Sequence, residues 1–170
     1  MTKEDLLGFW KNFYSFSRPL LTAFWDVPRE NFVLEGYTEL AYDDLALPIL
    51  EGQTISQPTT VMIMLDALEL KRTDTVLEIG GGSGYVGALL SRLAKRVVVS
   101  EINRDLCRVC KTNLKDYDVE VFCGDGFTLE QTFDKILVSA ACPEFPQELL
   151  AKLTSKGILI APVGGKNVQH

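Results

Sequence analysis

Hydrophobic positions in the first part of the chain recur at helical spacing. In residues 3–16 they predict an amphipathic helix, and a second, short helix is predicted over 18–25. A third is predicted from Ser56 to about Leu70, because Gln57-Pro58 places proline in the first turn, where its missing N–H costs nothing. Residues 31–53 are interrupted by Gly36, Pro48 and Gly52 and are predicted to be irregular.

The pattern changes at about residue 74, where short apolar β-rich segments begin to alternate with helical ones. Strands are predicted over 75–79, 97–100, 119–123, 135–139 and 157–162, and helices over 83–94, 104–114 and 144–153. Such alternation implies βαβ crossovers and a parallel sheet covered on both faces. We therefore predict a single domain over 1–170 of the α/β class, a doubly wound, mainly parallel Rossmann-like sheet. Residues 73–163 form its core and 1–72 a helical N-terminal cap.

Composition narrows the function. The chain has 170 residues, of which 46% are hydrophobic, enough for one globular core. Acidic residues outnumber basic ones by 23 to 17 without a basic stripe, which argues against a nucleic-acid partner. No apolar run approaches the ~20 residues that span a bilayer, and the N-terminus does not resemble a signal peptide. We therefore expect a cytoplasmic protein with no membrane partner.

The cysteines of a cytoplasmic protein are expected to be reduced thiols, and this chain has four: Cys107, Cys110, Cys123 and Cys142. Cys107 and Cys110 form a CxxC, but they fall within a predicted helix and not at the strand-to-helix junction of a redox motif. A zinc site would need two more ligands, and the only histidine is His170. We expect an inert pair and no metal site.

A glycine-rich loop, Glu78-Ile79-Gly80-Gly81-Gly82-Ser83-Gly84, joins the first predicted strand of the core to the next helix. Glycines let the backbone approach a ligand closely, and the helix N-terminus offers unpaired N–H groups. Glu101, followed by Ile102, ends the second strand, where a carboxylate can accept both hydroxyls of a ribose. Asp125-Gly126 follows the third strand, where a carboxylate can meet an adenine amino group.

Two cofactors and one simpler interpretation fit this loop. NAD would use a GxGxxG, matched at Gly82, Gly84 and Gly87, and the loop could also be a plain connection. S-adenosylmethionine is favoured by Glu78 two residues before the first glycine, by Asp125, and by a chain too short for a second mononucleotide-binding half. The candidate cofactor residues are Glu78, Gly80, Gly82, Gly84, Glu101, Ile102, Asp125 and Gly126.

Over residues 27–168 the chain resembles the protein-L-isoaspartate O-methyltransferase family. The resemblance lies in Val27-Pro28-Arg29-Glu30-Asn31-Phe32, Ala41-Tyr42-Asp43-Asp44, Gly52-Gln53-Thr54-Ile55-Ser56-Gln57-Pro58, Gly124-Asp125-Gly126 and Ser139-Ala140-Ala141-Cys142-Pro143-Glu144. The Gly52–Pro58 block is the most diagnostic, because the glycine loop alone fits many other methyltransferases.

The resemblance implies an activity and the residues that serve it. Members transfer a methyl group from S-adenosylmethionine to the free carboxylate of L-isoaspartyl and D-aspartyl residues in damaged proteins, leaving S-adenosylhomocysteine. By resemblance, Ser56 is the catalytic residue and hydrogen-bonds the acceptor carboxylate, while Ser83 contacts the cofactor. The implied substrate residues are Thr54, Ile55, Ala140, Ala141, Cys142 and Pro143. Ser56 could instead be a helix N-cap.

The expected chemistry suits these residues. A carboxylate has a reference pKa near 4, so it is already ionised at neutral pH and needs positioning and no general base. An amine methylase typically carries Asn/Asp-Pro-Pro-aromatic after strand four, where this chain has Ser139-Ala140-Ala141-Cys142-Pro143. Two alternatives stay open: a methyltransferase for another small carboxylate, and a cofactor-binding module with little turnover.

Two departures from the family pattern carry expectations. Gly81 stands where the family often has threonine or serine, which should loosen the loop slightly. Family members also continue some tens of residues beyond the position of His170 and cover the last predicted strand, Ile158–Pro162. With that strand at an uncovered sheet edge, we expect self-association through it, weak turnover, or both.

Overall fold

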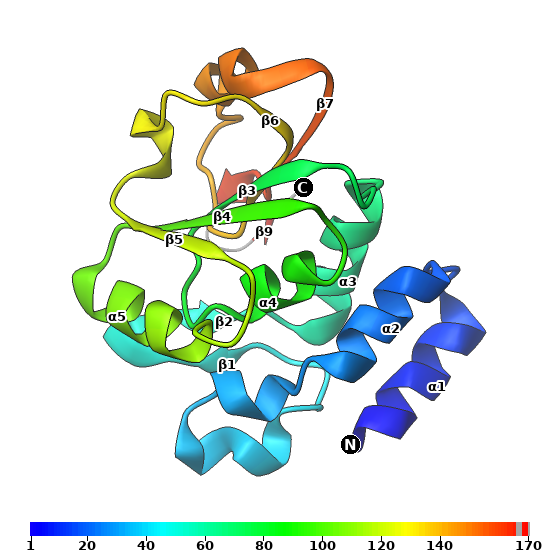
Figure 1. The fold of residues 1–170 in the computed structure, drawn as a ribbon. Helices are drawn as coiled ribbons and strands as arrows, with labels where there is room; N and C mark the ends of the chain where they lie inside the picture. The colour runs from blue at the N-terminus through cyan, green and yellow to red at the C-terminus, as the bar shows by residue number, and fades with distance from the viewer. Residues whose placement is uncertain (166–167, 170) are drawn as a thin grey trace.

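A five-stranded parallel sheet forms the centre of the computed structural model, which describes residues 1–165 and 168–169 (Figure 1). Its strands are β3 (Thr75–Ile79), β4 (Arg96–Glu101), β5 (Glu120–Cys123), β6 (Phe133–Val138) and β7 (Leu153–Ile160). The order is β5-β4-β3-β6-β7, and every neighbouring pair is parallel. From β3 the chain adds β4 and β5 on one side, then returns and adds β6 and β7 on the other. This order confirms the predicted doubly wound sheet.

Alternate residues of the central strands bury two separate clusters. Val76, Val97, Val99 and Leu137 face the helices α4 (Tyr85–Ser91) and α5 (Arg104–Asn113). Leu77, Val98 and Ile136 are among those that face the other side, which the short 3-10 turns η4 (Gly126–Thr128) and η5 (Gln147–Lys152) help to cover. Both faces of the sheet are therefore buried, as its apolar strands require.

The link between β6 and β7 differs from the prediction of an α-helix over residues 144–153. It contains only the six-residue turn η5, and β7 already begins at Leu153. Pro146 stands at the N-cap position of η5 and cannot donate a backbone hydrogen bond. Little chain is left for a full helix between this proline and the strand that follows.

The N-terminal segment packs onto the α4 face of the sheet. It contains α1 (Lys3–Phe13), α2 (Arg18–Asp26) and α3 (Pro58–Ala67), and Figure 1 shows α1 and α2 side by side. Between α2 and α3 lie the 3-10 turns η1 (Arg29–Phe32), η2 (Glu35–Leu40) and η3 (Leu50–Gly52) and the antiparallel pair β1 (Leu47–Pro48) and β2 (Thr54–Ile55). Leu6, Trp10 and Phe24 join the same buried cluster as Val76, so this cap and the sheet share a core.

The chain beyond β7 returns to the loop that follows β6. Val163 forms an isolated parallel bridge with Cys142, and β8 (Gly164–Gly165) pairs with β9 (Val168–Gln169) in antiparallel fashion. His170, considered above as a metal ligand, lies outside the described residues. In the described part of the chain, no helix has the length and apolar character needed to cross a membrane.

The expectation that all four cysteines are reduced thiols is wrong for two of them. Cys107 in α5 and Cys123 at the end of β5 form a disulfide, with their Cα atoms 5.6 Å apart. Cys110 and Cys142 are free. Cys107 and Cys110 do lie one turn apart in a helix, as predicted, and both are buried. Helix packing places α5 against β5, a proximity that the spacing of the cysteines does not reveal.

Candidate functional site

The candidate site lies at the carboxyl ends of the strands, beside β3, where the winding of the sheet reverses direction. Ligands of open α/β sheets bind at such a reversal because the loops there diverge and leave a crevice. The glycine loop follows β3 directly, Glu101 ends β4, and Asp125 follows β5. The topology therefore brings the three predicted cofactor segments to one edge of the sheet.

Backbone hydrogen bonds connect the glycine loop to the end of β4. Gly80 N and Gly81 N both donate to Ser100 O, at 2.9 and 3.0 Å. Gly80, Gly82 and Gly84 have φ values of 87°, 54° and 94°, a left-handed region that side chains disfavour. A β-carbon at Gly82 would also lie 3.3 Å from Ile49 Cδ1, so this loop leaves little space for a larger residue.

Gly81 is confined by packing, which gives no support to the expectation of a looser loop. A β-carbon at this position would lie 2.3 Å from Val99 Cγ1 and 3.3 Å from Cys110 Sγ. The loop therefore lies directly on β4 and α5. Threonine or serine at this position would require a smaller residue than Val99 beneath it.

Glu101 links the loop to the start of α5. Its Oε2 accepts a hydrogen bond from Gly82 N at 2.8 Å, and its Oε1 accepts one from Asn103 N at 2.9 Å. The residue is only 6% exposed but lines a cavity. Each carboxylate oxygen retains a further lone pair, so Glu101 can still accept hydroxyl donors from a ligand.

Two adjoining cavities, of about 450 and 580 Å³, are both lined by Gly80 of the glycine loop. The larger one brings Thr54 and Ser56 together with Gly80, Gly82, Glu101, Ile102, Ala140 and Ala141. The smaller one is lined by Asp125, Gly126 and Phe127 among others, and shares Gly80, Ile102 and Ala140 with the first. Ile102 is 71% exposed at this shared boundary. Ser56 therefore lines one cavity and Asp125 the adjoining one.

Six predicted site residues line neither cavity: Ile55, Glu78, Ser83, Gly84, Cys142 and Pro143. Ile55 and Ser83 are buried at 6% and 5% exposure, and Gly84 is the N-cap of α4. Cys142 bonds through its backbone to the end of the chain: its N donates to Pro162 O at 2.9 Å. Pro143 is exposed and Cys142 is half-buried, so the structure does not bring these two into either cavity.

Glu78 is buried beneath the glycine loop and accepts a hydrogen bond from the segment that follows the neighbouring strand β6. Ser139 Oγ, which belongs to a residue of the larger cavity, donates to Glu78 Oε1 at 2.8 Å. Glu78 Oε2 is buried with no partner among the described residues. Burial raises the pKa of Glu78 to about 8, and the neighbouring Glu101 adds to the increase. Glu78 thus joins β3 to the loop after β6 and does not itself reach either cavity.

Ser56 is not the cap of α3, so that alternative for its role is wrong. The N-cap residue is Gln57, which makes no side-chain capping bond. The helix is capped by Asp44 instead, whose Oδ1 accepts from Thr59 N at 2.9 Å and whose Oδ2 accepts from Thr59 Oγ1 at 2.7 Å. No hydrogen bond among the described residues engages the Ser56 hydroxyl, which is therefore available to a ligand.

Several cavity residues were missed by the sequence reasoning. Asn103 accepts from Asp105 N and Leu106 N and caps α5, a role that its place before a predicted helix could have indicated. Ser139 adjoins the predicted Ala140 but was given no role. Ile49 and Phe127 carry no sequence signal, since their place in the site depends on packing. In the described part of the chain, no three His, Cys, Asp or Glu residues are grouped to hold a metal.

Comparisons with known proteins agree on one family. The family model described as protein-L-isoaspartate(D-aspartate) O-methyltransferase matches residues 2–170. Protein-L-isoaspartate O-methyltransferase 2 of Rhodopseudomonas palustris (strain HaA2) is 48% identical over 156 residues, which cover 88% of this chain and 72% of that protein. The corresponding protein of Methanoculleus marisnigri is 45% identical and is covered to 71%.

Solved structures show the same fold. A protein-L-isoaspartate O-methyltransferase of known structure matches with a TM-score of 0.85 and 30% identity, over 95% of this chain and 55% of that one. A Plasmodium falciparum protein in complex with S-adenosyl-L-homocysteine also matches with a TM-score of 0.85, at 22% identity, over 99% of this chain and 87% of its own. At that identity the second match shows the fold alone.

Proposed function

The chain belongs to the protein-L-isoaspartate(D-aspartate) O-methyltransferase family, and we propose that it methylates the free carboxylate of L-isoaspartyl and D-aspartyl residues in damaged proteins. The observation that carries the proposal is the shared cavity, in which Ser56 of the Gly52–Pro58 block meets the glycine loop and Glu101. An acceptor positioned by Ser56 therefore lies in the same space as the cofactor segments. The net charge of −6 argues against a nucleic-acid acceptor.

The residues at this edge of the sheet fit S-adenosylmethionine. The glycine loop presents a backbone with no side chain at Gly80 and Gly82, and the Glu101 carboxylate beside it suits a ribose. Asp125 in the adjoining cavity suits an amino group of adenine, with Ile102 and Phe127 as apolar contacts for the ring. When bound, the cofactor supplies an electrophilic methyl group on a sulfonium sulfur.

The chain's own contribution to the reaction is positioning. The acceptor carboxylate is already ionised, so no residue has to remove a proton. The Ser56 hydroxyl has no partner among the described residues and can donate a hydrogen bond to one oxygen of the acceptor carboxylate. This bond would hold the second carboxylate oxygen toward the methyl donor. Ala140 and Ala141 line the same cavity with small side chains. Thr54 is exposed at its rim, where the backbone of a protein substrate would lie.

We place the protein in the cytoplasm, where its substrates would be ageing proteins of the cell. The free thiols Cys110 and Cys142 fit a reducing compartment, in which the Cys107–Cys123 disulfide would be exposed to reduction by cellular thiols. Ile55, Cys142 and Pro143 line neither cavity but lie near Thr54, Ser56 and Ala141 in the chain, and would act by shaping the substrate pocket.

The test is a methyl-transfer assay on an isoaspartyl peptide, with the aspartyl peptide of the same sequence as control. Base-labile methyl ester should form on the isoaspartyl peptide alone. Small dicarboxylic acids serve as rival acceptors in the same assay. Equal labelling of both peptides, or labelling of the small acids only, would contradict the proposed acceptor. S-adenosylhomocysteine should raise the melting temperature of the protein. Gly82→Val should abolish that increase, because the branched side chain would occupy the space beside the glycine loop where the cofactor binds.

A further inference from the structure

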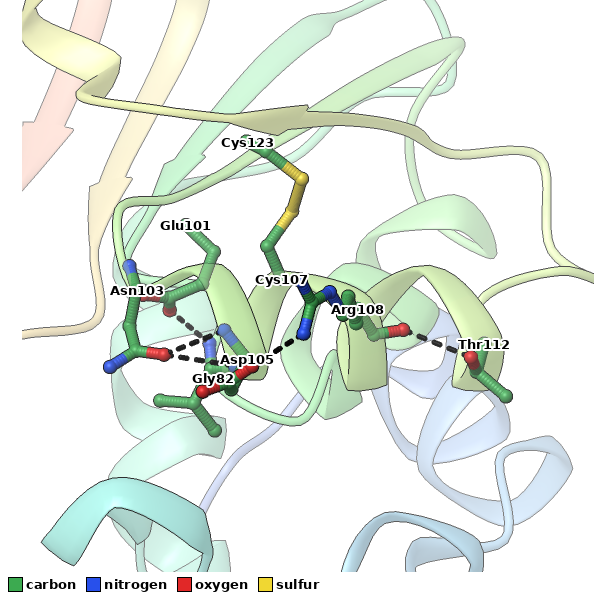
Figure 2. Close-up of a disulfide and its surroundings, with 9 residues drawn as sticks. Gly82, Glu101, Asn103, Asp105, Cys107, Arg108, Thr112 and Cys123 are labelled. Carbon is green, nitrogen blue, oxygen red and sulfur yellow. Dashed lines mark hydrogen bonds and ion pairs between the residues drawn. A yellow bond between two sulfur atoms is a disulfide. The ribbon is translucent and has the colours of Figure 1, made fainter.

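A disulfide joins the two segments that carry the cofactor residues (Figure 2). Cys123 is the last residue of β5 and directly precedes Gly124 and Asp125, which line the smaller cavity. Cys107 lies in the first half of α5, and its N donates to Asn103 O at 2.8 Å. Asn103 lines the larger cavity. Each sulfur is therefore attached to a segment that forms part of the site.

Hydrogen bonds of Glu101 connect the same two segments. Gly124 N donates to Glu101 O at 3.0 Å, which holds the start of the Asp125 loop. Asn103 N donates to the Glu101 carboxylate at 2.9 Å, and Asn103 Oδ1 caps α5. A closed ring thus runs from Cys123 through Gly124, Glu101 and Asn103 to α5 and back through the disulfide. The covalent link and the Glu101 contacts hold the same geometry.

We propose that Cys107 and Cys123 form a reversible thiol–disulfide modification site that sets the affinity for the cofactor, an inference that rests on the proposed function. The disulfide holds Glu101, Asn103 and the Asp125 loop in their binding arrangement before the cofactor arrives. Pre-organisation of this kind strengthens binding because less conformational freedom is lost on association. Reduction removes the covalent link between β5 and α5, leaves only the hydrogen bonds to hold this geometry, and weakens binding.

The exposure of the two cysteine residues determines how the exchange proceeds. Cys107 is fully buried and Cys123 is exposed. A small thiolate such as that of glutathione attacks Cys123 Sγ, the bond to Cys107 breaks, and Cys107 leaves as a thiolate that takes up a proton. A second small thiolate attacks the glutathione sulfur of the mixed disulfide and releases Cys123. In sum, two small thiols are oxidised to one disulfide, and the protein disulfide is reduced to two thiols.

The remaining cysteines do not compete for this exchange. Cys110 is buried beneath Gly81 and Gly84, and burial raises its pKa. The pKa of Cys142 is also raised, and that residue lies after β6, away from α5. The structure holds Cys107 and Cys123 next to each other, with their Cα atoms 5.6 Å apart, so oxidation joins these two thiols.

The experiment measures S-adenosylhomocysteine binding by calorimetry on the wild-type protein equilibrated in glutathione buffers from fully reducing to fully oxidising. Peptide mass spectrometry after alkylation reports the Cys107–Cys123 pair at each point. The oxidised protein should bind about five-fold more tightly or better, the lower range of typical coupling between sites. Saturating S-adenosylhomocysteine should shift the disulfide equilibrium toward oxidation by the same factor, because such coupling is reciprocal.

Cys123→Ser should show the affinity of the reduced wild type in every buffer, and Thr112→Ala, the control at an exposed position of the same helix α5, should behave as wild type. Equal affinity of the oxidised and reduced wild type would overturn the inference, as would the absence of the Cys107–Cys123 pair under oxidising conditions. Both results come from the wild-type chain and do not depend on a variant that folds. Absence of binding in both states would contradict the proposed function instead.

Discussion

Among single residues, Ser56 is placed at the cavity by the turn between β2 and α3 and has no helix to cap. We therefore predict that Ser56→Ala leaves the melting temperature and the S-adenosylhomocysteine affinity near wild type. A hydrogen bond to a charged group contributes about 1.5–3 kcal/mol, so methylation of an isoaspartyl peptide should fall roughly 10- to 100-fold. Ser155→Ala, at an exposed position of β7, is the matched control and should keep full activity. Unchanged turnover in Ser56→Ala would remove its positioning role.

Glu78 gives a pH dependence whose sign follows from its burial. Its pKa is raised from 4.5 to about 8 in the folded chain, so between these values the folded state binds more protons than the unfolded state. The free energy of unfolding should therefore decrease as pH rises through this window, with a slope of at most about 1.4 kcal/mol per pH unit from this group. The stability it contributes is complete below the window and lost above it.

Glu78→Gln removes the titrating group while keeping a hydrogen-bond acceptor for Ser139. Urea unfolding of both proteins at several pH values across the window should show a flatter profile for the variant. Parallel profiles would mean that Glu78 ionises normally in the folded protein.

At the scale of elements, α3 depends on a cap from a distant segment. Asp44 bonds to both Thr59 N and Thr59 Oγ1, and Trp10 Nε1 donates to the same hydroxyl at 2.7 Å. This chain of contacts connects α1, the Asp44 segment and the start of α3, next to Ser56. Loss of a helix cap typically costs about 0.5–2 kcal/mol.

Asp44→Ala should accordingly lower the free energy of unfolding by about 1–2 kcal/mol, measured by chemical denaturation. Asp66→Ala is the matched control, because Asp66 is an exposed acidic residue of the same helix. A loss of stability equal in the two variants would point to net charge and not to the cap.

For the whole molecule, β7 is an edge strand whose described partner in the sheet is β6 alone. Its apolar stretch Ile158–Ile160 offers backbone N–H and C=O groups to a further strand. We propose that chains associate through this edge. Light scattering after size exclusion should give a mass above 18.9 kDa that rises with concentration.

Hydrogen exchange locates the contact, since amides of β7 should exchange more slowly in concentrated than in dilute solution while those of α1 stay unchanged. A constant mass of one chain at all concentrations would contradict the proposal.

The sequence alone predicts the alternation of strands and helices. It also identifies the glycine loop and the carboxylates that lie beside it. β3 spans 75–79 as predicted, and the cofactor segments Gly80–Gly82, Glu101 and Asp125 meet at one edge of the sheet. The strands and helices can be predicted because the spacing of apolar side chains shows which face of each element is buried. The site can be predicted because the carboxyl ends of parallel strands lie at the same edge of the sheet. The Gly52–Pro58 block likewise contributes Thr54 and Ser56, which line the larger cavity as predicted.

The contacts between elements could not be predicted from the sequence and are seen only in the tertiary structure. Cys123 reaches Cys107 because α5 lies on β5, Ser139 reaches Glu78 because β6 adjoins β3, and Val99 leaves no space above it for a side chain at Gly81. Asp44, and not Ser56, caps α3. Each of these pairs is separated by many residues along the chain and leaves no periodic signal, since it depends on how closely two packed elements approach each other.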